Sequence, residues 1–461
     1  MPLTKTNSPT ELTDLRPIAL ICSLGKVFEK LIIKQLNKYI NDHSLISINQ
    51  FGYRSGFGTE ACLLKLISDI NGAIDRQMIT ISVLFDLSKA FDNVNHSILL
   101  EKLKRKNFSN DFLKLLHSYL SNRTIAVTDD SNNLSSWHNV SCGVPQGSIL
   151  GPLLFILYAD DLHSNMKYST SISYVDDTQI YLHCYSSDIA NGLKKIESDA
   201  NSFVMWCKNN CFQVNIRKTM AIIYGTSPAI SSINFDMLDK IIVDGQEINF
   251  VNEVKNLGIW FDSCLTWKKH ITVTIGRISS VLYSLKLHKH SLSFALRKNL
   301  IESLIFPIID YGSPLLLGIT DELNKKLEIA INNCIRFIFK IPRWLHISGY
   351  RDQLLWLKVK FRRFYFLGCL LYKIVHFKIP AALIPYFKRT DSIKDIRRSK
   401  RTVTHTFVVS HSNIVTCQKS FPIAASQLWN KLPQNISNLK NFDSFKLELF
   451  NYLVIRQNIV R

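Results

Sequence analysis

The chain has 461 residues, of which 46% are hydrophobic and 20% charged; this excludes wholesale disorder and allows about three domains. Lys and Arg outnumber Asp and Glu by 56 to 36, and the formal net charge of +20 favours a polyanionic partner, nucleic acid before membrane surface, over charge kept for solubility alone. The 10 cysteines form no Cys-x-x-Cys pair and follow no signal peptide, so we expect reduced thiols in an intracellular, unsecreted protein, and no zinc site.

The first part of the chain is predicted to be a loop followed by helices. We expect one helix around Lys26–Ile40, a second around Thr59–Ile74, and then a strand that ends at Asp86. A further helix is predicted over 110–120, because its apolar residues recur at helical spacing. A hairpin should follow, with its turn at 129–133.

A first Tyr-x-Asp-Asp pattern, Tyr158-Ala-Asp160-Asp161, closes a long apolar run. Ser148 can cap a helix over this run, and Pro152 suits its first turn. The two aspartates would then lie near the helix C-terminus, which disfavours negative charge. We therefore interpret Asp160 and Asp161 as structural or solvent-exposed, not catalytic.

The second copy of this pattern, Tyr174-Val175-Asp176-Asp177, lies between two short runs that alternate between polar and apolar residues. This predicts a β-hairpin with both carboxylates at its tip. Each aspartate, like Asp86, could simply begin a turn. Together, carboxylates at adjacent strand ends repel one another unless a cation neutralises them, and two Mg²⁺ ions need such carboxylates for in-line attack on a phosphate. Metal-assisted nucleotidyl transfer is therefore our first hypothesis.

The rest of the chain becomes helical and basic. An amphipathic helix is predicted over 188–208, above the sheet, and a hairpin should turn at Asp244-Gly245. Helices should dominate beyond about residue 263, including a terminal helix near 442–453, with a basic run at 394–401. The apolar stretches 304–319 and 361–377 are interrupted by proline or charge, so we predict no membrane span. One helix should bury the stripe Leu323, Leu327, Ile331, Cys334 and Ile338.

Three motifs in order resemble those of the reverse transcriptases of non-LTR (LINE-type) retrotransposons. They are Phe85-Asp86-Leu-Ser-Lys-Ala-Phe91-Asp92, Gly143-Val-Pro-Gln-Gly-Ser-Ile-Leu-Gly-Pro and Tyr174-Val-Asp-Asp. The resemblance extends over nearly the whole chain through Asp14-Leu-Arg-Pro-Ile-Ala-Leu, Gly25-Lys-Val-Phe-Glu-Lys, Asn49-Gln-Phe-Gly-Tyr-Arg54-Ser-Gly-Phe-Gly-Thr59, Asn215-Ile-Arg-Lys218-Thr219, Val254-Lys-Asn-Leu-Gly-Ile-Trp-Phe-Asp262 and Leu428-Trp-Asn-Lys-Leu-Pro433.

This resemblance implies an α+β, right-hand polymerase fold with a mostly helical C-terminal region. It places N-terminally truncated fingers at 1–75, the palm with interleaved fingers elements at 76–262, a helical thumb at 263–345 and a basic, mostly helical region at 346–461. Because the chain opens almost directly at Asp14, we expect the polymerase region without an endonuclease domain.

The resemblance also implies the catalytic residues. Asp86 and Asp176 would ligate two Mg²⁺ ions, for which Mn²⁺ can substitute, and Asp177 would help to shape the site as a third catalytic and metal-site carboxylate. One ion would activate the primer 3′-hydroxyl, and the other would neutralise the triphosphate and the leaving pyrophosphate.

Four further residues match nucleotide-binding positions of the family. Phe91 would pack under the sugar and exclude a 2′-hydroxyl, and Gln146 would line the template–nucleotide pocket. Arg54 and Lys218 would lie near the phosphates. The alternatives are that Phe91 is a plain core residue and that Arg54 and Lys218 are solvated surface charges.

The predicted function is RNA-directed DNA polymerisation, with an RNA template, a DNA primer or target DNA, and dNTPs, and no membrane partner. One alternative is a catalytically inactive nucleic-acid-binding remnant. Another is a related polymerase, such as a group II intron maturase or telomerase. The match at Leu428–Pro433 speaks against this second alternative. We expect the protein to be located in the nucleus, the cytoplasm or both. The sequence determines neither the oligomeric state nor which Lys and Arg contact nucleic acid.

Overall fold

The computed structural model describes residues 2–4, 11, 15–128, 133–390, 407–412 and 414–459. Most of the predicted turn at 129–133, Asp14 and the basic run at 394–401 lie outside these ranges. The chain divides into two compact units. The first comprises Met1–Gly58, Ile81–Ala221 and Phe235–Phe250, and the second comprises Thr59–Thr80, Ile222–Asn234 and Val251–Arg461.

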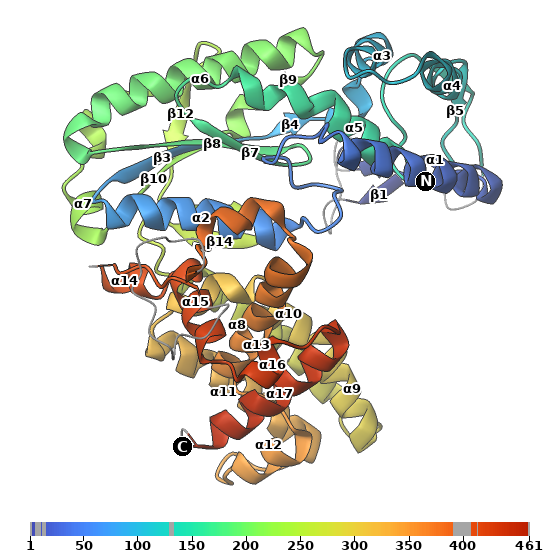
Figure 1. The fold of residues 1–461 in the computed structure, drawn as a ribbon. Helices are drawn as coiled ribbons and strands as arrows, with labels where there is room; N and C mark the ends of the chain where they lie inside the picture. Colours follow the sequence, from blue (N-terminus) through green and yellow to red (C-terminus); the bar gives the residue numbers. More distant parts are fainter. Residues whose placement is uncertain are drawn as a thin grey trace. The chain divides into compact units, whose positions relative to one another are not determined.

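Most of a six-stranded sheet lies in the first unit (Figure 1). Its strands, from one edge to the other, are β11 (Ile241–Val243), β12 (Gln246–Phe250), β10 (Met220–Tyr224), β3 (Ile79–Phe85), β8 (Asp177–Cys184) and β7 (Thr170–Tyr174). The sheet is mixed, because β10 and β12 are parallel whereas β11–β12 and β7–β8 are antiparallel hairpins. The central strand β3 is buried at every position except Leu84, including the polar residues Thr80 and Ser82, as expected for a strand covered on both faces.

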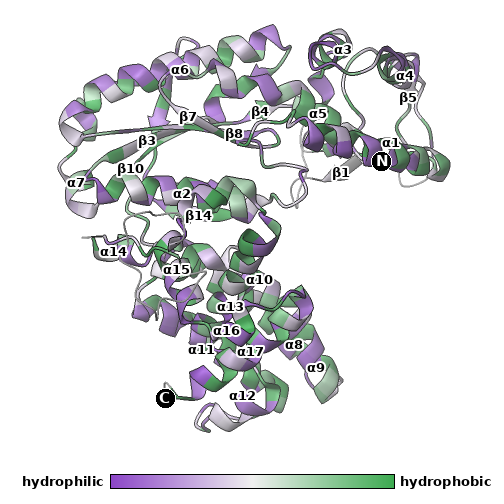
Figure 2. Cartoon of the chain, viewed as in Figure 1, coloured by the Kyte–Doolittle hydropathy of each residue, from purple (hydrophilic) through white to green (hydrophobic). Residues whose placement is uncertain are grey.

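Helix α6 (Ile189–Asn209) lies along the sheet and contacts β8 and β11 (Figure 1). Its buried residues recur at helical spacing and include Leu193, Ile196, Ala200 and Phe203, which confirms the amphipathic helix predicted there. Figure 2 shows the resulting alternation of hydrophobic and hydrophilic residues along α6. Phe203 stacks on Phe85 of β3 with a centroid distance of 4.0 Å, so the helix is packed directly against the strand that precedes Asp86.

The first unit also contains helix α5 (Gly151–Ala159), which is buried at every position except Pro152, and three further α-helices. They are α1 (Ser23–Asp42), α3 (His96–Arg105) and α4 (Asn110–Leu120), and α3 packs against both α4 and α5. Short ladders join β1 (Pro2–Thr4) to β2 (Leu15–Pro17), β4 (Leu87–Ser88) to β9 (Gln213–Val214), and β5 (Arg123–Ile125) to β6 (His138–Val140).

The second unit is mainly helical. Its elements are α2 (Thr59–Asp75), α7 (Ser227–Ser231), the hairpin β13 (Glu253–Asn256) and β14 (Ile259–Asp262), α8 (Lys268–Leu287), α9 (Phe294–Leu304), α10 (Phe306–Asp310), α11 (Asp321–Phe339), α12 (Ser348–Leu354), α13 (Val359–Tyr372), α14 (Val415–Gln418), α15 (Phe421–Lys431), α16 (Gln434–Ser437) and α17 (Phe442–Ile459). The predicted stripe of α11 is buried at all five positions. Within the described part of the chain, no helix is both long and apolar enough to span a bilayer. The expected α+β class with a mostly helical C-terminal region is therefore confirmed.

Candidate active site

The predicted hairpin forms, and the two aspartates have different positions in it: one lies in the turn and the other in a strand. Strands β7 and β8 pair up to Tyr174 opposite Asp177, which leaves only Val175 and Asp176 in the turn. Val175 is buried and has a left-handed backbone (φ +63°), which is rare for a β-branched residue. Asp176 therefore lies at the tip, and Asp177 is the first residue of β8.

Asp86 follows β3, the strand next to β8, and its charge acts on Asp176 and Asp177, so it lies near the start of β8. Its backbone carbonyl accepts a hydrogen bond from the Asn215 amide at 2.8 Å. The same loop carries Lys218, whose Nζ is 3.7 Å from Asp86 Oδ2. The structure thus brings Lys218 to Asp86 as an exposed ion pair.

The charge of Asp86 acts on both aspartates of the hairpin. Partial burial, followed by the charges of Asp176 and Asp86, raises the pKa of Asp177 to about 6. Burial and then the charge of Asp86 also raise the pKa of Asp176, against a backbone hydrogen bond and the charge of Arg16, which lower it. The charge of Asp86 therefore adds to the effect of burial at both residues of the hairpin pair, and a cation at the tip would oppose both effects.

The donor set suits a hard divalent cation, since it consists of carboxylate oxygens alone. Among the described residues, no group of three or more His, Cys, Asp or Glu side chains is arranged to hold an ion. Mg²⁺ usually takes only one or two carboxylates and completes its shell with water and substrate phosphate. Asp86 and Asp176 fit that requirement.

The Gly143–Gly147 turn packs against the short helix η2 (Ala90–Asn93). The amide of Val144 donates to the carbonyl of Phe91 at 2.9 Å, and Gln146 Nε2 donates to Asp92 Oδ1 at 3.0 Å. Gly143 has φ +87°, and a Cβ there would lie 2.8 Å from the Asp92 carbonyl oxygen, so only glycine fits. The structure therefore brings Gln146 beside the segment that carries Phe91.

Phe91 is half-buried, and its ring stacks on Phe155 of α5 at a centroid distance of 4.6 Å. Arg54 lies in the loop before α2, where its Nη1 donates to the carbonyls of Ser47 (2.5 Å) and Gln50 (2.9 Å). Its guanidinium carbon is 4.0 Å from the centroid of Phe57, and burial lowers its pKa. These contacts give Arg54 a structural role within its loop, and its role at the phosphates stays a prediction.

The first Tyr-x-Asp-Asp copy has the structural role that we predicted. Asp160 Oδ2 is 2.5 Å from Lys106 Nζ, and Asp161 Oδ1 is 2.7 Å from Lys102 Nζ. Both lysines lie at the C-terminal end of α3, and Asp160 also accepts a hydrogen bond from the amide of Ser47 at 2.6 Å.

Sequence reasoning missed four residues around the hairpin tip. Gln50 hydrogen-bonds to the backbone of Val175, and Gly52 lies against it. Arg16 and Tyr53 both lie close enough to Asp176 to interact with it electrostatically. They also lie close enough to interact with each other. Their only signal was that they fall within segments resembling the family.

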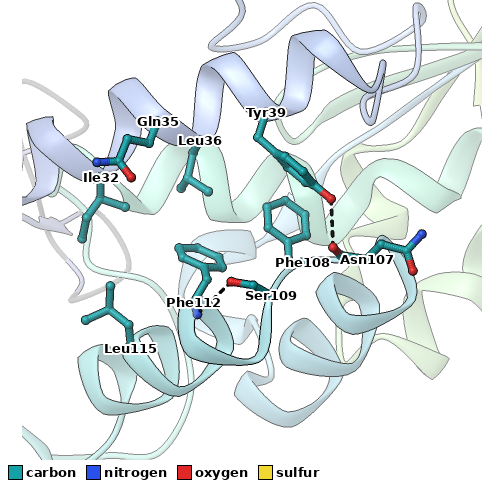
Figure 3. A pocket seen from close by; sticks show the side chains of 9 residues that line it. All are labelled: Ile32, Gln35, Leu36, Tyr39, Asn107, Phe108, Ser109, Phe112 and Leu115. Atoms are coloured by element: carbon teal, nitrogen blue, oxygen red, sulfur yellow. Dashed lines mark hydrogen bonds between the residues drawn. The ribbon is translucent and has the colours of Figure 1, made fainter.

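A separate cavity of about 360 Å³ lies between α1 and α4 (Figure 3). It is lined mainly by apolar and aromatic side chains, including Leu36, Phe108 and Phe112, and Tyr39 Oη donates to the Asn107 carbonyl at its edge. None of the predicted site residues lines this cavity, so it is distinct from the aspartate site.

Comparisons with known proteins agree with these motifs. Residues 4–261 match the protein family described as reverse transcriptase (RNA-dependent DNA polymerase). The probable RNA-directed DNA polymerase from transposon BS of Drosophila melanogaster is 28% identical over 355 residues, 74% of this chain and 38% of that protein. The RNA-directed DNA polymerase from mobile element jockey of the same species is 28% identical over 66% of this chain and 33% of that protein.

The probable RNA-directed DNA polymerase from transposon X-element, also of Drosophila melanogaster, is 29% identical over 71% of this chain and 36% of that protein. The chain thus spans about a third of the length of these relatives. Among solved structures, apo telomerase from Candida tropicalis aligns over 78% of this chain and 59% of that chain, at 14% identity and a TM-score of 0.37. That likeness is too slight to carry an argument.

Proposed function

The chain belongs to the reverse transcriptase (RNA-dependent DNA polymerase) family, and from this premise we propose that it adds deoxynucleotides to a primer 3′-hydroxyl on an RNA template. The observation that carries the proposal is the convergence of Asp86, Asp176 and Asp177 at the hairpin tip, where burial and, after it, the charges of neighbouring carboxylates raise the pKa values of the hairpin pair. Carboxylates held in mutual repulsion are suited to a reaction that brings cations and phosphates to them.

We assign Asp86 and Asp176 as the residues that would hold two Mg²⁺ ions, or Mn²⁺ in their place, with Asp177 shaping the charge of the site. The ions would supply Lewis acidity at the primer hydroxyl and the triphosphate. Lys218, 3.7 Å from Asp86, would exchange this ion pair for the phosphates of an incoming nucleotide.

The remaining assignments concern the nucleotide and its surroundings. Phe91 and Gln146 lie on segments that hydrogen-bond to each other, so they would form one wall under the sugar and the template base. Arg54 would reach the phosphates from its loop. We propose fingers at 1–75, palm at 76–262, thumb at 263–345 and a C-terminal region at 346–461, with nucleic acid held through its phosphates.

The test is primer extension on an RNA template with Mg²⁺, comparing the wild-type chain with Asp176→Ala. We expect the wild type to incorporate dNTPs and the variant to lose at least about 100-fold in rate, since it lacks a carboxylate that acts on the reacting phosphate. Asp161→Asn is the matched control, because it alters the same motif where the aspartate is paired with Lys102.

If the wild type incorporates no more than Asp176→Ala, the chain is not a polymerase as it stands, and the inactive nucleic-acid-binding remnant replaces this proposal. If Asp161→Asn loses activity and Asp176→Ala does not, the chemistry belongs to the first copy of the motif, and our assignment to the hairpin is wrong.

A further inference from the structure

The hairpin tip is held by a buried side chain from another segment. Gln50 is only 1% exposed. Its Oε1 accepts a hydrogen bond from the Val175 amide at 3.0 Å, and its Nε2 donates to the Val175 carbonyl at 3.4 Å. One side chain therefore satisfies both backbone groups of the residue that precedes Asp176.

Gly52 closes the same contact. Its amide donates to Gln50 Oε1 at 2.9 Å. A Cβ on Gly52 would lie 2.4 Å from Val175 Cγ2 and 2.8 Å from the Val175 nitrogen, distances at which something must shift. Gln50 and Gly52 thus fit against the tip with no room for a larger side chain.

The segment that carries Gln50 has further contacts besides those with Val175. It runs beside β7, where the Phe51 amide donates to the Ser173 carbonyl at 2.8 Å and the Ser173 amide donates to the Asn49 carbonyl at 2.9 Å. Its start is held by Asp160, which accepts from the Ser47 amide. Gln50 therefore acts from a fixed support.

Such a support is needed because of the backbone of Val175. A β-branched residue at φ +63° is conformationally strained, and such strain persists only where the surroundings enforce it. Without its two hydrogen bonds to Gln50, the turn would relax and carry Asp176 with it.

We propose that Gln50 is a positioning residue for polymerisation, which sets the place of Asp176 and Asp177 through the backbone of Val175, with Gly52 allowing the close approach. This inference rests on the proposed function, since its effect on rate requires an active chain. Gln50 touches none of the reacting groups and acts only through the tip.

The test uses the full chain with Gln50→Met, which fills nearly the same volume but keeps neither hydrogen bond, and Gly52→Ala, which pushes on Val175. We expect kcat for dNTP incorporation to fall about 100-fold in both, the loss that a displacement of about 1 Å can cause. KM for the primer–template should change less than about twofold, because the tip contributes to the reaction and not to duplex binding. Gln35→Ala, on an exposed glutamine of α1, is the matched control.

Hydrogen exchange of the Val175 amide gives a readout that does not depend on activity. We expect its protection to drop in Gln50→Met while amides in the centre of α6 keep theirs, which separates loosening of the tip from unfolding. Wild-type kcat and unchanged Val175 protection in Gln50→Met would overturn the inference. If the wild type itself is inactive, the proposed function fails, and the exchange measurement alone decides whether Gln50 holds the tip.

Discussion

The Tyr-x-Asp-Asp pattern occurs twice in this chain, in opposite electrostatic surroundings. At Asp160 and Asp161 each carboxylate is paired with a lysine at the C-terminal end of α3, Asp161 with Lys102 and Asp160 with the capping residue Lys106. At the hairpin, Asp176 and Asp177 face Asp86 and each other, and their pKa values are raised. Identical residues therefore serve as a structural ion-pair cluster in one place and as a candidate cation site in the other, because only the second keeps an excess of negative charge.

Phe91 is the residue on which nucleotide selection can be tested. In Phe91→Ala the wall under the sugar would lose its ring, so we expect the preference for dATP over ATP in primer extension to fall by about 10- to 100-fold. Phe91→Tyr keeps the ring and should keep the preference. An unchanged preference in Phe91→Ala would make Phe91 a core residue that only packs on Phe155.

Glu60, in the first turn of α2, should make the stability of the folded chain depend on pH. Burial raises its pKa from 4.5 to about 7, against the opposing charge of Lys373. Between these values the folded chain binds a proton that the unfolded chain has released, so this group's contribution to stability is present below pH 4.5 and is lost as the pH rises to about 7.

The neutral variant Glu60→Gln should therefore raise the unfolding temperature at about pH 8 and change it little at about pH 4. Thermal unfolding at both pH values measures the difference, with the exposed Glu448→Gln as control. Equal effects of Glu60→Gln at the two pH values would show that burial of this carboxyl does not govern its ionisation.

At the scale of elements, α1, α4 and α5 are joined by one buried carboxylate. Glu29 of α1 is 2% exposed and accepts hydrogen bonds from Tyr119 Oη of α4 and the Ile149 amide, both at 2.6 Å. It also accepts from the Leu150 amide at 3.4 Å, and Ser148 Oγ accepts from the Gly151 amide at 2.7 Å. The negative charge lies at the N-terminus of α5, the end that stabilises it.

Glu29→Ala would leave these donors unpaired in the interior, so we expect a loss of about 3 kcal/mol in the free energy of unfolding. Urea denaturation measures this loss. The neighbouring Lys30→Ala, on an exposed residue, should change the free energy by no more than about 0.5 kcal/mol. A midpoint shift no larger than that of Lys30→Ala would mean that water replaces the carboxylate at no cost.

Local patterns predicted most of these elements well. The hairpin at Asp244-Gly245 forms as expected, with both residues at positive φ, and the helix predicted over 110–120 is α4. What could not be predicted was burial of single polar residues. Glu29 and Gln50 are polar residue types that are usually exposed, and contacts with distant segments make them interior groups here.

At the scale of the whole molecule, the net charge of +20 predicts salt-sensitive binding of nucleic acid. For about six phosphate contacts, affinity for single-stranded RNA should fall by at least about 100-fold between about 50 and 200 mM salt. Fluorescence anisotropy measures the slope, and a morpholino oligomer of the same bases, which has no backbone charge, is the control. A slope near zero for RNA would exclude phosphate contacts as the main source of affinity.

The sequence by itself determined the hairpin that carries Asp176 and Asp177, the strand before Asp86 and the family resemblance, because these depend on local periodicity and on motifs continuous in the chain. The tertiary structure decided which aspartate pair is neutralised, which residues support Val175, and that Lys218 reaches Asp86. The reason is physical: the ionisation of a carboxylate and the strain of a turn depend on charges and hydrogen-bond partners brought from segments as many as 125 residues apart, and no local pattern encodes these.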